Sequence, residues 1–432
     1  MKRTAILALT AVTLSLTACG APGGGVQPSA VLKTQALTGA SGALDPTYGT
    51  AGVVNPAGGQ FSAGLAIQHN GAALVLSGSG RFVFPAGLTS TLTRLTPQGQ
   101  ADASFGQQGA VTLSGGAGAL ALVCPNGANP YGDWGAECTV PERPLVAVTF
   151  FSRDTPRQID LKLYRFLPSG QPDPAFGQNG VVTTPPAWRS YVASIRIQAD
   201  GRMLLAGSFI DAPGGGYLGR LTRNGTPDPE FGTDGLVKLR PEQTPMAMVL
   251  PESEYPVVLI SGPTAVSVAR FTDAGRPDTH FGVGGVVGLD FGPGGNGYAL
   301  LVRENGKVVV GGIGALYQLR PDGAPDLEFG VNGRVALPNQ TVNGLTLDDQ
   351  SRLLAGLDVS PGRGQATLAR LLPRGSLDPS FGTGGLASVV LGTGAGRWGF
   401  DQVAVQRDGN ILGAATHSFH HADNVAVARL LP

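Results

Sequence analysis

Charged side chains are scarce in this 432-residue sequence, and neither sign is in excess. Asp, Glu, Lys and Arg make up 14% of the residues, against about 25% in an average soluble protein. Lys plus Arg and Asp plus Glu are each 30, so the chain lacks the basic surplus that is typical of a nucleic-acid-binding protein, and we expect no nucleic-acid partner. Because 42% of the residues are hydrophobic and the formal net charge is zero, the composition also excludes an intrinsically disordered chain.

Long helix-forming segments are lacking as well. The chain contains 67 Gly and 33 Pro, which is about twice the usual share of these two residues. Backbone breakers at this density exclude a helical bundle or a coiled coil. The composition therefore predicts a large β-rich protein with many turns.

The N-terminus has the features of an export signal. Lys2 and Arg3 precede residues 4–17, which are apolar and uncharged; the stretch is too short for a permanent membrane span but suits a signal peptide. It ends in LTACG, where small residues before a cysteine resemble the bacterial lipobox. The resemblance implies cleavage before Cys19 and acylation of its thiol and amine, which would anchor the protein stably in a membrane. An ordinary secretory signal with an incidental Cys19 is the alternative.

The sequence thus predicts three parts. Residues 1–18 are a lipoprotein signal peptide, residues 19–40 are the lipidated Cys19 and a flexible Gly/Pro/Ala-rich tether, and residues 41–432 are the folded body. Gly20 after the cysteine fits an outer-membrane destination. We expect an extracytoplasmic protein that is lipid-anchored to the bacterial cell envelope, at the outer membrane or the cell surface.

Cysteine is rare, with three residues in the whole chain. Once Cys19 is lipidated, Cys124 and Cys138 remain, and two thiols in an oxidising compartment usually pair. We predict a disulfide between them.

The strongest signal is the pattern Asp-x-x-(Phe/Tyr)-Gly-x-x-Gly, which occurs seven times. Its aspartates are Asp45, Asp102, Asp173, Asp228, Asp278, Asp326 and Asp378. Asp can accept backbone N–H bonds in a turn, the aromatic ring supplies an apolar anchor, and the glycines permit positive φ. We therefore expect seven structural turns. The widest spacing between copies contains Cys124 and Cys138, which predicts an inserted loop closed by their disulfide.

Each repeat also contains four candidate strands. Hairpin signals such as IQHNGAALVLSG and IQADGRMLLAGS place Asn-Gly or Asp-Gly between apolar stretches. LDDQSRLLAGL is a weakened copy, and two more are degenerate: LVCPNGANP through RPLVAVTF, and MVLPESEYPVVLIS. A third strand such as LTRL or LGRL follows, and a fourth comes after the turn, as in Gly180-Val181-Val182.

The two chain ends hold complementary parts of one repeat. The first turn, at Asp45, stands alone, whereas the last strand, with Arg429, has no turn after it. We therefore predict an all-β fold: a seven-bladed β-propeller with four antiparallel strands per blade, in which the N-terminal strand joins the C-terminal blade and closes the ring. An open β-solenoid or two packed sandwiches are the alternatives.

These repeats resemble the bacterial delta-60 repeat. The shared features are the D-P-x-F-G-x-x-G-V-V unit and its period in the fifties, and the resemblance covers residues 43–432. It implies a propeller-like exported repeat protein and supplies no reaction. Tyr48 in place of Phe, and the missing Pro after Asp102, Asp278 and Asp326, depart from the pattern.

Several residue groups invite a chemical interpretation. The motif aspartates suggest calcium, with Asp228, Glu230 and Asp234 as the best local group, but each turn offers one main carboxylate and an Asx turn is the simpler interpretation. An arginine stands eight residues before most of these aspartates; it either pairs with an Asp or lays its stem across an apolar strand. The strand residues in question are Arg94, Arg165, Arg220, Arg270, Gln318, Arg370 and, in the last strand, Arg429.

Histidines cluster once, near the C-terminus. His417, His420, His421 and Asp423 could hold zinc, but a solvated connecting loop explains them more simply. We predict no metal and no cofactor.

Three functional hypotheses follow. The leading one is a monomeric envelope lipoprotein, held at the membrane by the lipid on Cys19, whose propeller is a binding scaffold for protein or polysaccharide. The alternatives are an extracytoplasmic hydrolase or lyase with a site at the propeller mouth, and a structural envelope component. The sequence contains no Gly-x-Ser-x-Gly, P-loop or His-Glu-x-x-His motif, so it names no catalytic residue and leaves the question of an enzyme open.

Overall fold

The computed structural model describes residues 40–432 apart from 57–58, 80–87, 126–137, 139, 152–158, 211–214, 264, 360–363, 392–397 and 418–424. These residues belong to one compact unit, Thr38–Pro432. The predicted signal peptide, Cys19 and most of the tether lie outside the described residues, as do His420, His421 and Asp423. In the described part, no helix has the length and apolar character needed to cross a membrane.

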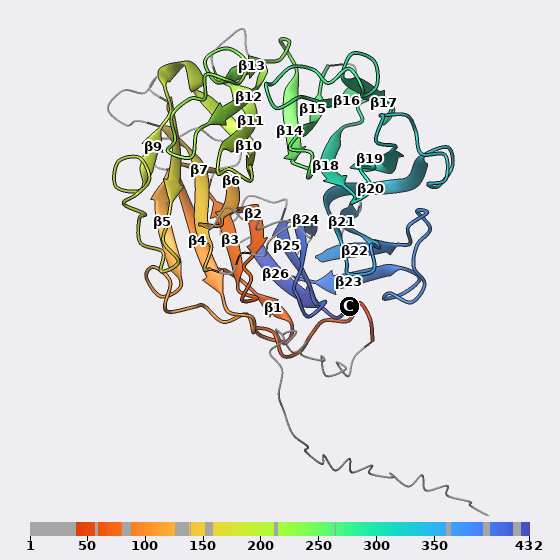
Figure 1. Ribbon diagram of the computed structural model, residues 1–432. Coiled ribbons are helices and arrows are strands. Elements are labelled where there is room, and N and C mark those ends of the chain that lie inside the picture. The colour runs from red at the N-terminus through yellow and green to blue at the C-terminus, as the bar shows by residue number, and fades with distance from the viewer. Residues whose placement is uncertain are drawn as a thin grey trace, which may run out of the picture. The chain divides into compact units, whose positions relative to one another are not determined.

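Antiparallel strands make up almost all of the regular structure, and one 3-10 turn, Pro186–Trp188, is the single helical element among the described residues. The strands follow the predicted repeats, and we number the groups units 1 to 7 (Figure 1). Unit 1 contains β2 (Phe61–Ile67), β3 (Ala73–Gly78), β4 (Thr89–Leu95) and β5 (Ala110–Ser114). Unit 2 contains β6 (Gly116–Val123), β7 (Arg143–Phe151), β8 (Ile159–Arg165) and β9 (Val181–Thr183).

The next two units are also separate four-stranded sheets. Unit 3 contains β10 (Ser190–Ile197), β11 (Met203–Phe209), β12 (Gly216–Leu221) and β13 (Leu236–Lys238). Unit 4 contains β14 (Thr244–Val249), β15 (Val257–Ser261), β16 (Val266–Arg270) and β17 (Val286–Leu289). In each sheet the strands pair in chain order, which is the pattern that consecutive hairpins produce.

The remaining strands form a ten-stranded sheet that divides into three such groups. Unit 5 contains β18 (Gly297–Val302), β19 (Val308–Leu319) and the first part of β20 (Arg334–Leu347). Unit 6 contains the rest of β20 with β21 (Leu353–Val359), β22 (Gln365–Leu371) and β23 (Leu386–Val390). Unit 7 contains β24 (Trp398–Val405), β25 (Ile411–His417), β26 (Val425–Leu430) and β1 (Val53–Val54).

Two connections merge these three groups. The long strand β20 pairs with β19 mainly through Arg334–Ala336 and with β21 through Gln340–Leu347. One residue pair, Asp358 with Gly399, then links β21 to β24. Units 5 and 6 therefore share a strand, whereas strand pairing between units 6 and 7 is limited to one residue pair and side-chain packing joins them, as between Leu368 and Phe400.

The N-terminal segment of the body lies in the same unit as the C-terminus. Val53 pairs with Ala428, and Leu44 forms a bridge to Leu430 (Figure 1). Backbone hydrogen bonds extend the contact, including one of 2.9 Å from the Gly42 N–H to the Leu431 carbonyl. The complementary ends that the sequence shows are thus joined by main-chain pairing.

The hydrophobic core lies between neighbouring units. Between units 1 and 2, Leu74 and Leu92 pack with Val146 and Val148. The same kind of cluster joins unit 1 to unit 7, where Val75 packs with Leu412 and Val427. Strands that lie between two such clusters, such as β3 and β12, are buried on both faces. This burial explains why the repeats have few charges and many Val, Leu and Ala residues.

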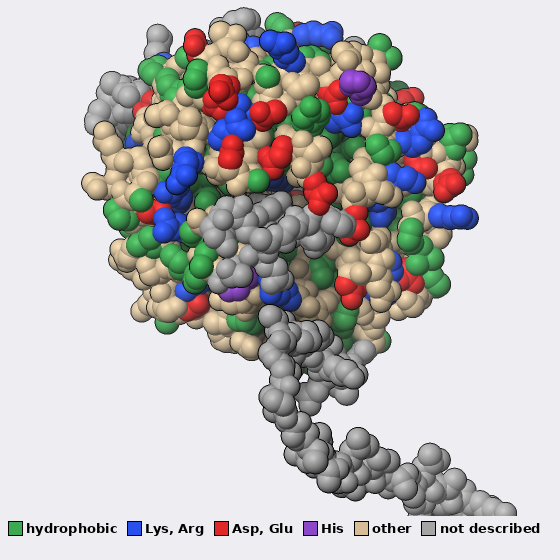
Figure 2. Space-filling view, in the orientation of Figure 1, with side chains coloured by type: hydrophobic (Ala, Val, Ile, Leu, Met, Phe, Trp, Pro, Cys, Tyr) green, Lys and Arg blue, Asp and Glu red, His purple; other side chains and the backbone are tan. Residues whose placement is uncertain are grey.

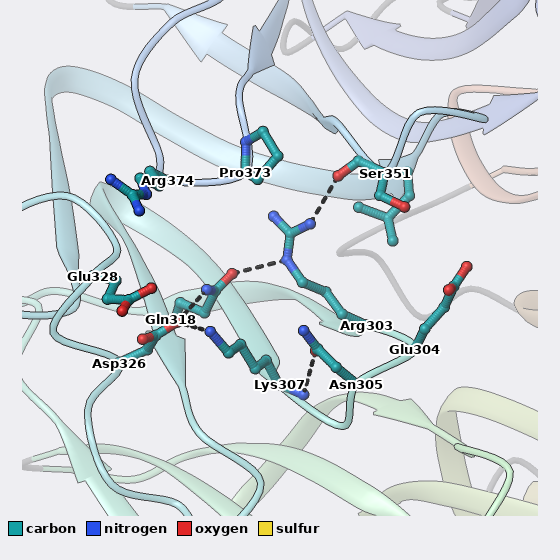
Figure 3. Close-up of a pocket in the computed structure, with 11 residues that line it drawn as sticks. Arg303, Glu304, Asn305, Lys307, Gln318, Asp326, Glu328, Ser351, Pro373 and Arg374 are labelled. Carbon is teal, nitrogen blue, oxygen red and sulfur yellow. Dashed lines mark hydrogen bonds and ion pairs between the residues drawn. The ribbon is translucent and has the colours of Figure 1, made fainter.

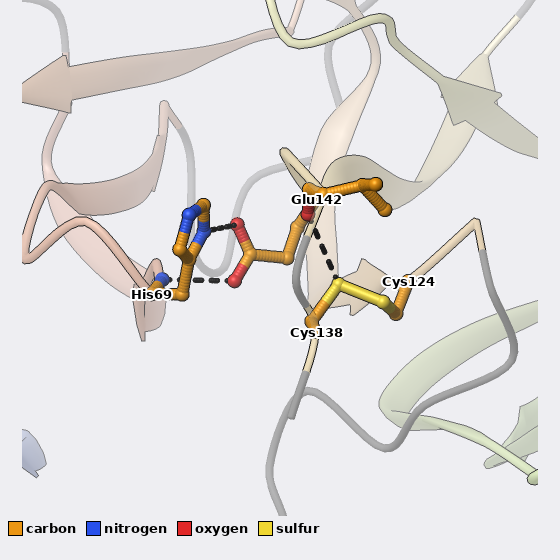
Figure 4. Close-up of a disulfide and its surroundings, with 5 residues drawn as sticks. His69, Cys124, Cys138 and Glu142 are labelled. Atoms are coloured by element: carbon orange, nitrogen blue, oxygen red, sulfur yellow. Dashed lines mark hydrogen bonds and ion pairs between the residues drawn. A yellow bond between two sulfur atoms is a disulfide. The ribbon is translucent and has the colours of Figure 1, made fainter. Parts of the chain in front are cut away.

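The predicted disulfide between Cys124 and Cys138 is confirmed, with Cα atoms 5.7 Å apart (Figure 4). Most of the inserted loop between them, residues 126–137, lies outside the described residues. Shortly after it, the buried Glu142 carboxylate accepts hydrogen bonds from the His69 backbone N–H at 2.8 Å and contacts the His69 Nδ1 at 3.0 Å. Glu254 makes the corresponding contact to the Ala199 N–H at 3.3 Å. The two hairpins that are degenerate in sequence therefore each supply a glutamate to the preceding unit.

Candidate functional site

A recurring Arg–Asp–aromatic arrangement occupies the turn of six of the seven repeats. In unit 3, the Asp228 Oδ1 accepts the Glu230 N–H at 3.0 Å, as in an Asx turn, and its Oδ2 accepts the Arg220 Nε–H at 2.7 Å. The guanidinium carbon of Arg220 lies 4.9 Å from the centre of the Phe231 ring, within cation–π range. Equivalent ion pairs join Arg94 to Asp102, Arg165 to Asp173, Arg270 to Asp278, Arg370 to Asp378 and Arg429 to Asp45.

These turns also connect one unit to the next. The motif glycine after the aromatic ring has positive φ, and its N–H donates to a turn carbonyl of the following unit, as from Gly106 to Ser169 at 2.8 Å. The arginine extends in the same direction: Arg270 Nη1 donates to the Pro321 carbonyl at 2.7 Å. The glycine contact also runs from unit 6 to unit 7, Gly382 to Ser41, and from unit 7 to unit 1, Gly49 to Gln98. The recurring charged groups are thus engaged in holding units together.

The electrostatics of these aspartates fit a structural role. Burial by itself raises the pKa of each carboxyl, but hydrogen bonds from the turn and from the neighbouring cation outweigh it, so that each pKa lies below the usual 3.8. This holds for Asp45, Asp102, Asp173, Asp278, Asp326 and Asp378. A calcium ion at Asp228 would face both Arg220 and Arg202, whose Nη1 is 3.5 Å from the same carboxylate oxygen. The local group of Asp228, Glu230 and Asp234 is therefore unsuited to a cation.

Acid should destabilise the fold through these carboxylates. A pKa that is lower in the folded state means that the unfolded chain binds the proton more tightly, so the stabilisation is complete above the unfolded value and is lost as pH falls. Glu254, whose pKa is raised by burial, acts in the opposite sense but is one group against six. We expect a melting temperature that is constant above about pH 5 and falls steeply below about pH 4. A melting curve that does not change between pH 3 and pH 7 would contradict this.

Tyr48 supplies a second test of the arrangement. Its side chain is fully buried, its hydroxyl has no hydrogen-bond partner among the described residues, and burial raises its pKa. Phe occupies this place in the other repeats, so Tyr48→Phe should stabilise the protein by about 1–3 kcal/mol by removing an unsatisfied buried hydroxyl. Phe381→Tyr, the matched change in unit 6, should have the opposite effect. Urea unfolding measures both; a destabilising Tyr48→Phe would show that the hydroxyl has a partner.

Unit 5 departs from the arrangement. Gln318 stands where the other units have arginine, and its Nε2–H donates to the Asp326 Oδ2 at 2.6 Å. A guanidinium comes instead from Arg303, at the end of β18; its Nε–H donates to the Gln318 Oε1 at 2.8 Å, and its Nη1 donates to the Ser351 carbonyl of unit 6 at 2.9 Å. Three other hairpins have glutamine at the position of Arg303, namely Gln68, Gln198 and Gln406. Arginine and glutamine have in effect exchanged places in unit 5.

The exchange coincides with a cavity of about 320 Å³ between units 5 and 6 (Figure 3). Arg303, Gln318 and Asp326 are its buried members, and Lys307, which donates to the Asp326 Oδ2 at 2.8 Å, is half-buried. The other lining residues are Glu304, Asn305, Glu328, Leu347, Ser351, Pro373 and Arg374. In the other units a long arginine lies over the motif ring, and four of these arginines also donate to a carbonyl of the next unit, namely Arg94, Arg220, Arg270 and Arg429. The shorter Gln318 ends at Asp326 and leaves this space open.

Arg303 is the unusual member of the cavity. Its side chain is 8% exposed, and its Nη2 has no hydrogen-bond partner among the described residues. Burial lowers its pKa, with Asp326 acting in the opposite direction. Side chains of both signs are interspersed over the face shown in Figure 2. The cavity itself is lined by cations and carboxylates alike, including Lys307, Arg374, Glu304 and Glu328. The cavity therefore combines a recessed cation with a mixed polar rim, and a ligand with an anionic or acceptor group can complete it.

Of the site residues that the sequence predicts, Asp326 lines the cavity and the others lie elsewhere. The motif aspartates are spread over all the units, and the Cys124–Cys138 disulfide is in unit 2. His417 lies beside Trp398, with ring centres 5.1 Å apart, at the end of β25. Within the described ranges, no group of three His, Cys, Asp or Glu residues is positioned to hold a metal. Gln318 is visible in the sequence as an exception among the arginines, but by itself it does not identify the site. The signal that marks the site is the combination of Gln318 with Arg303, an arginine where three other hairpins have glutamine.

Comparison with known proteins agrees with the topology. Residues 198–231 match the family model described as "Domain of unknown function (DUF5122) beta-propeller". No curated protein matches the chain. Similar solved structures include a Dos1 propeller (TM-score 0.48, 8% identity, 88% of this chain and 94% of that one) and a puromycin hydrolase (TM-score 0.48, 16% identity, 90% and 54%). The polysaccharide lyase Uly1 has a TM-score of 0.46 at 10% identity, with coverage of 93% and 94%.

The fold is that of a β-propeller: an all-β protein built from successive antiparallel four-stranded groups. Similarities of this strength concern the fold and say nothing about activity. Any function must therefore be argued from the site.

Proposed function

We propose that this protein is a lipid-anchored binding scaffold of the bacterial cell envelope, built from delta-60-type repeats, that takes a polysaccharide or protein ligand. The body is a seven-bladed propeller whose last blade is completed by β1. Support for closure comes from the pairing of β1 with β26, from the core shared by units 1 and 7, and from the glycine contacts that run through units 6, 7 and 1.

The observation that carries the binding function is the cavity between units 5 and 6. It is the place where the repeat arrangement is broken, and it is lined by the buried guanidinium of Arg303, whose Nη2 has no hydrogen-bond partner among the described residues. Ligand sites typically combine a preformed hollow with a few fixed polar groups. The arginines and aspartates of the other repeat turns are engaged in ion pairs and, in part, in hydrogen bonds to the next unit. The propeller therefore serves as a frame for that site.

Binding is favoured over hydrolysis by the state of the buried carboxylate of the cavity, Asp326. A general acid works best with a pKa near the working pH, whereas the buried Asp326 of the cavity has a pKa below its usual value because hydrogen bonds from Lys307 and Gln318 outweigh the effect of burial. An ionised carboxylate that is already bonded to two donors is suited to fixing a site and poorly suited to donating a proton.

A ligand screen tests the proposal. The soluble form that begins at residue 20 would be melted alone and with cell-wall glycans, acidic and neutral polysaccharides, and envelope protein extracts. A ligand at 100 times its dissociation constant adds about 2.7 kcal/mol to the folded state. A polymer that raises the melting temperature and is recovered unchanged is the expected result. Turnover of a polymer, or the absence of any shift, would overturn the binding function.

Anchoring is tested separately. Cys19→Ser should move the protein from the membrane fraction to the soluble extracytoplasmic fraction, because the acyl chains that hold it would have no attachment point. Fractionation with antibody detection measures this. The Cys124→Ser variant is the matched control and should stay with the membrane; a Cys19→Ser protein that remains membrane-bound would refute the lipid anchor.

A further inference from the structure

We infer that the cavity between units 5 and 6 binds the carboxylate of an acidic sugar, a hexuronate residue, through Arg303. This inference rests on the proposed binding function and names its ligand. The hydrogen bonding of the Arg303 guanidinium is the first observation that supports it. Arg303 is more than nine-tenths buried, yet its Nε and Nη1 donate to neutral acceptors, an amide and a carbonyl, and its Nη2 finds no partner in the described part of the chain.

The positive charge of Arg303 has no contacting anion. Asp326, the nearest candidate, already accepts hydrogen bonds from Lys307 and Gln318, and no ion pair to Arg303 occurs among the described residues. A buried charge without a partner is costly, so an anion at the Nη2 would gain both a charge-assisted hydrogen bond and relief of that cost. Figure 3 shows the free terminal nitrogen pointing into the space that Pro373 and Arg374 border.

The rim limits the charge of that anion. Glu304 and Glu328 line the cavity and are exposed, and Arg374 is the additional exposed cation. Two nearby carboxylates would repel a phosphate dianion more strongly than a singly charged carboxylate. The charge pattern therefore favours a monoanion, held by Arg303 at the floor and Arg374 at the rim.

The remaining lining favours a sugar over a peptide side chain. Asn305, Gln318, Ser351 and Glu328 offer both donors and acceptors, whereas Leu347 and Pro373 are the two apolar members. Hydroxyl groups can donate to the rim carboxylates and accept from the amides. A volume of about 320 Å³ lies at the lower end of small-molecule sites, which suits one sugar residue. An apolar side chain would find little surface to bury.

The exchange of Arg303 and Gln318 supplies the decisive variant. The double substitution Arg303→Gln/Gln318→Arg recreates the arrangement of the other units, with glutamine in the hairpin and arginine over Phe329. It should fold, keep its melting temperature, and fill the cavity. Calorimetric titration with galacturonate and glucuronate oligosaccharides should show binding to the unaltered protein and a loss of affinity of about 10- to 100-fold in the variant, the range for a lost hydrogen bond to a charged group.

Controls separate the possible failures. Arg320→Gln, an exposed arginine that does not line the cavity, should bind as the unaltered protein does. Arg374→Gln should weaken binding several-fold and serves as the test if the double variant fails to fold.

Unchanged uronate affinity in both cavity variants would overturn the inference. Equal affinity for neutral glucose oligosaccharides, or for a peptide with a free C-terminal carboxylate, would overturn the acidic-sugar assignment. Binding of a different polymer with no uronate binding would leave the proposed scaffold standing, whereas binding of no polymer would refute both.

Discussion

Deleting residues 41–55 is expected to destabilise the whole body by about 6–10 kcal/mol, the combined cost of losing one large buried aromatic and one buried ion pair. The segment contains β1, the fully buried Tyr48, and Asp45, which is 1% exposed and 2.7 Å from Arg429. Its backbone also contacts unit 6 at Gly382 and unit 1 at Gln98. Removing it would leave one edge of β26 unpaired, although β25 still pairs with the other, and would break contacts to three units at once.

Calorimetry and urea unfolding would measure that loss. A lower melting temperature and a broader transition are expected, because the first and last units would no longer support each other. Deleting residues 20–35 of the predicted tether is the control and should leave the melt unchanged. If the 41–55 deletion melts as the complete body does, the propeller is not closed by its N-terminal strand.

Phe231→Ala should cost about 3–5 kcal/mol, which is the usual range for removing a buried phenyl ring. Phe231 is fully buried and packs with Leu204 and Leu218 of unit 3 and with Met248 and Val258 of unit 4. The substitution would leave an empty space between units 3 and 4 and weaken their contact. Arg220 would also lose the ring beneath its guanidinium.

Val283→Ala is the matched control for Phe231→Ala. Val283 lies in the turn of the next unit but is 89% exposed, so its truncation should change the unfolding free energy by less than about 0.5 kcal/mol. Chemical unfolding of the two variants side by side would show the contrast. A small effect of Phe231→Ala would mean that the motif ring is not an anchor of the interface between units.

Local signals in the sequence predicted the strands well. Turn residues such as the Asn-Gly at 70–71 and the Asp-Gly at 200–201 fix hairpins independently of the rest of the chain, and β2–β3 and β10–β11 form there. The pattern failed at β20. Pro338 and Asn339 suggest a break, yet the strand continues through them, with Asn339 at a φ of 61°. Pairing to two different partners, β19 and β21, holds the strand together in a way that local propensity does not express.

The candidate site could not be predicted from local sequence patterns. Gln318 is visible as an exception, but its effect depends on Arg303, which is 15 positions earlier, and on Ser351, which is 48 positions after Arg303. A cavity arises from side-chain lengths across two units, and no single repeat contains that information. The same holds for the glutamates of the degenerate hairpins, whose partners His69 and Ala199 lie in the preceding units.

The pairing of β1 with β26 also sets the order of folding. Thr47 and Arg429 are 382 positions apart and are joined by a hydrogen bond of 3.0 Å. The segment around Tyr48 is synthesised before the rest of the body and packs against Val75 and Leu95 of unit 1, but its pairing with β26 must wait until that strand has been made. Closing so long a loop adds little further entropy cost, but it delays this step until β26 is available. A chain that is truncated before β26 leaves β1 unpaired and takes Val425 and Val427 from the cluster around Tyr48, so the last blade of the body stays unfinished.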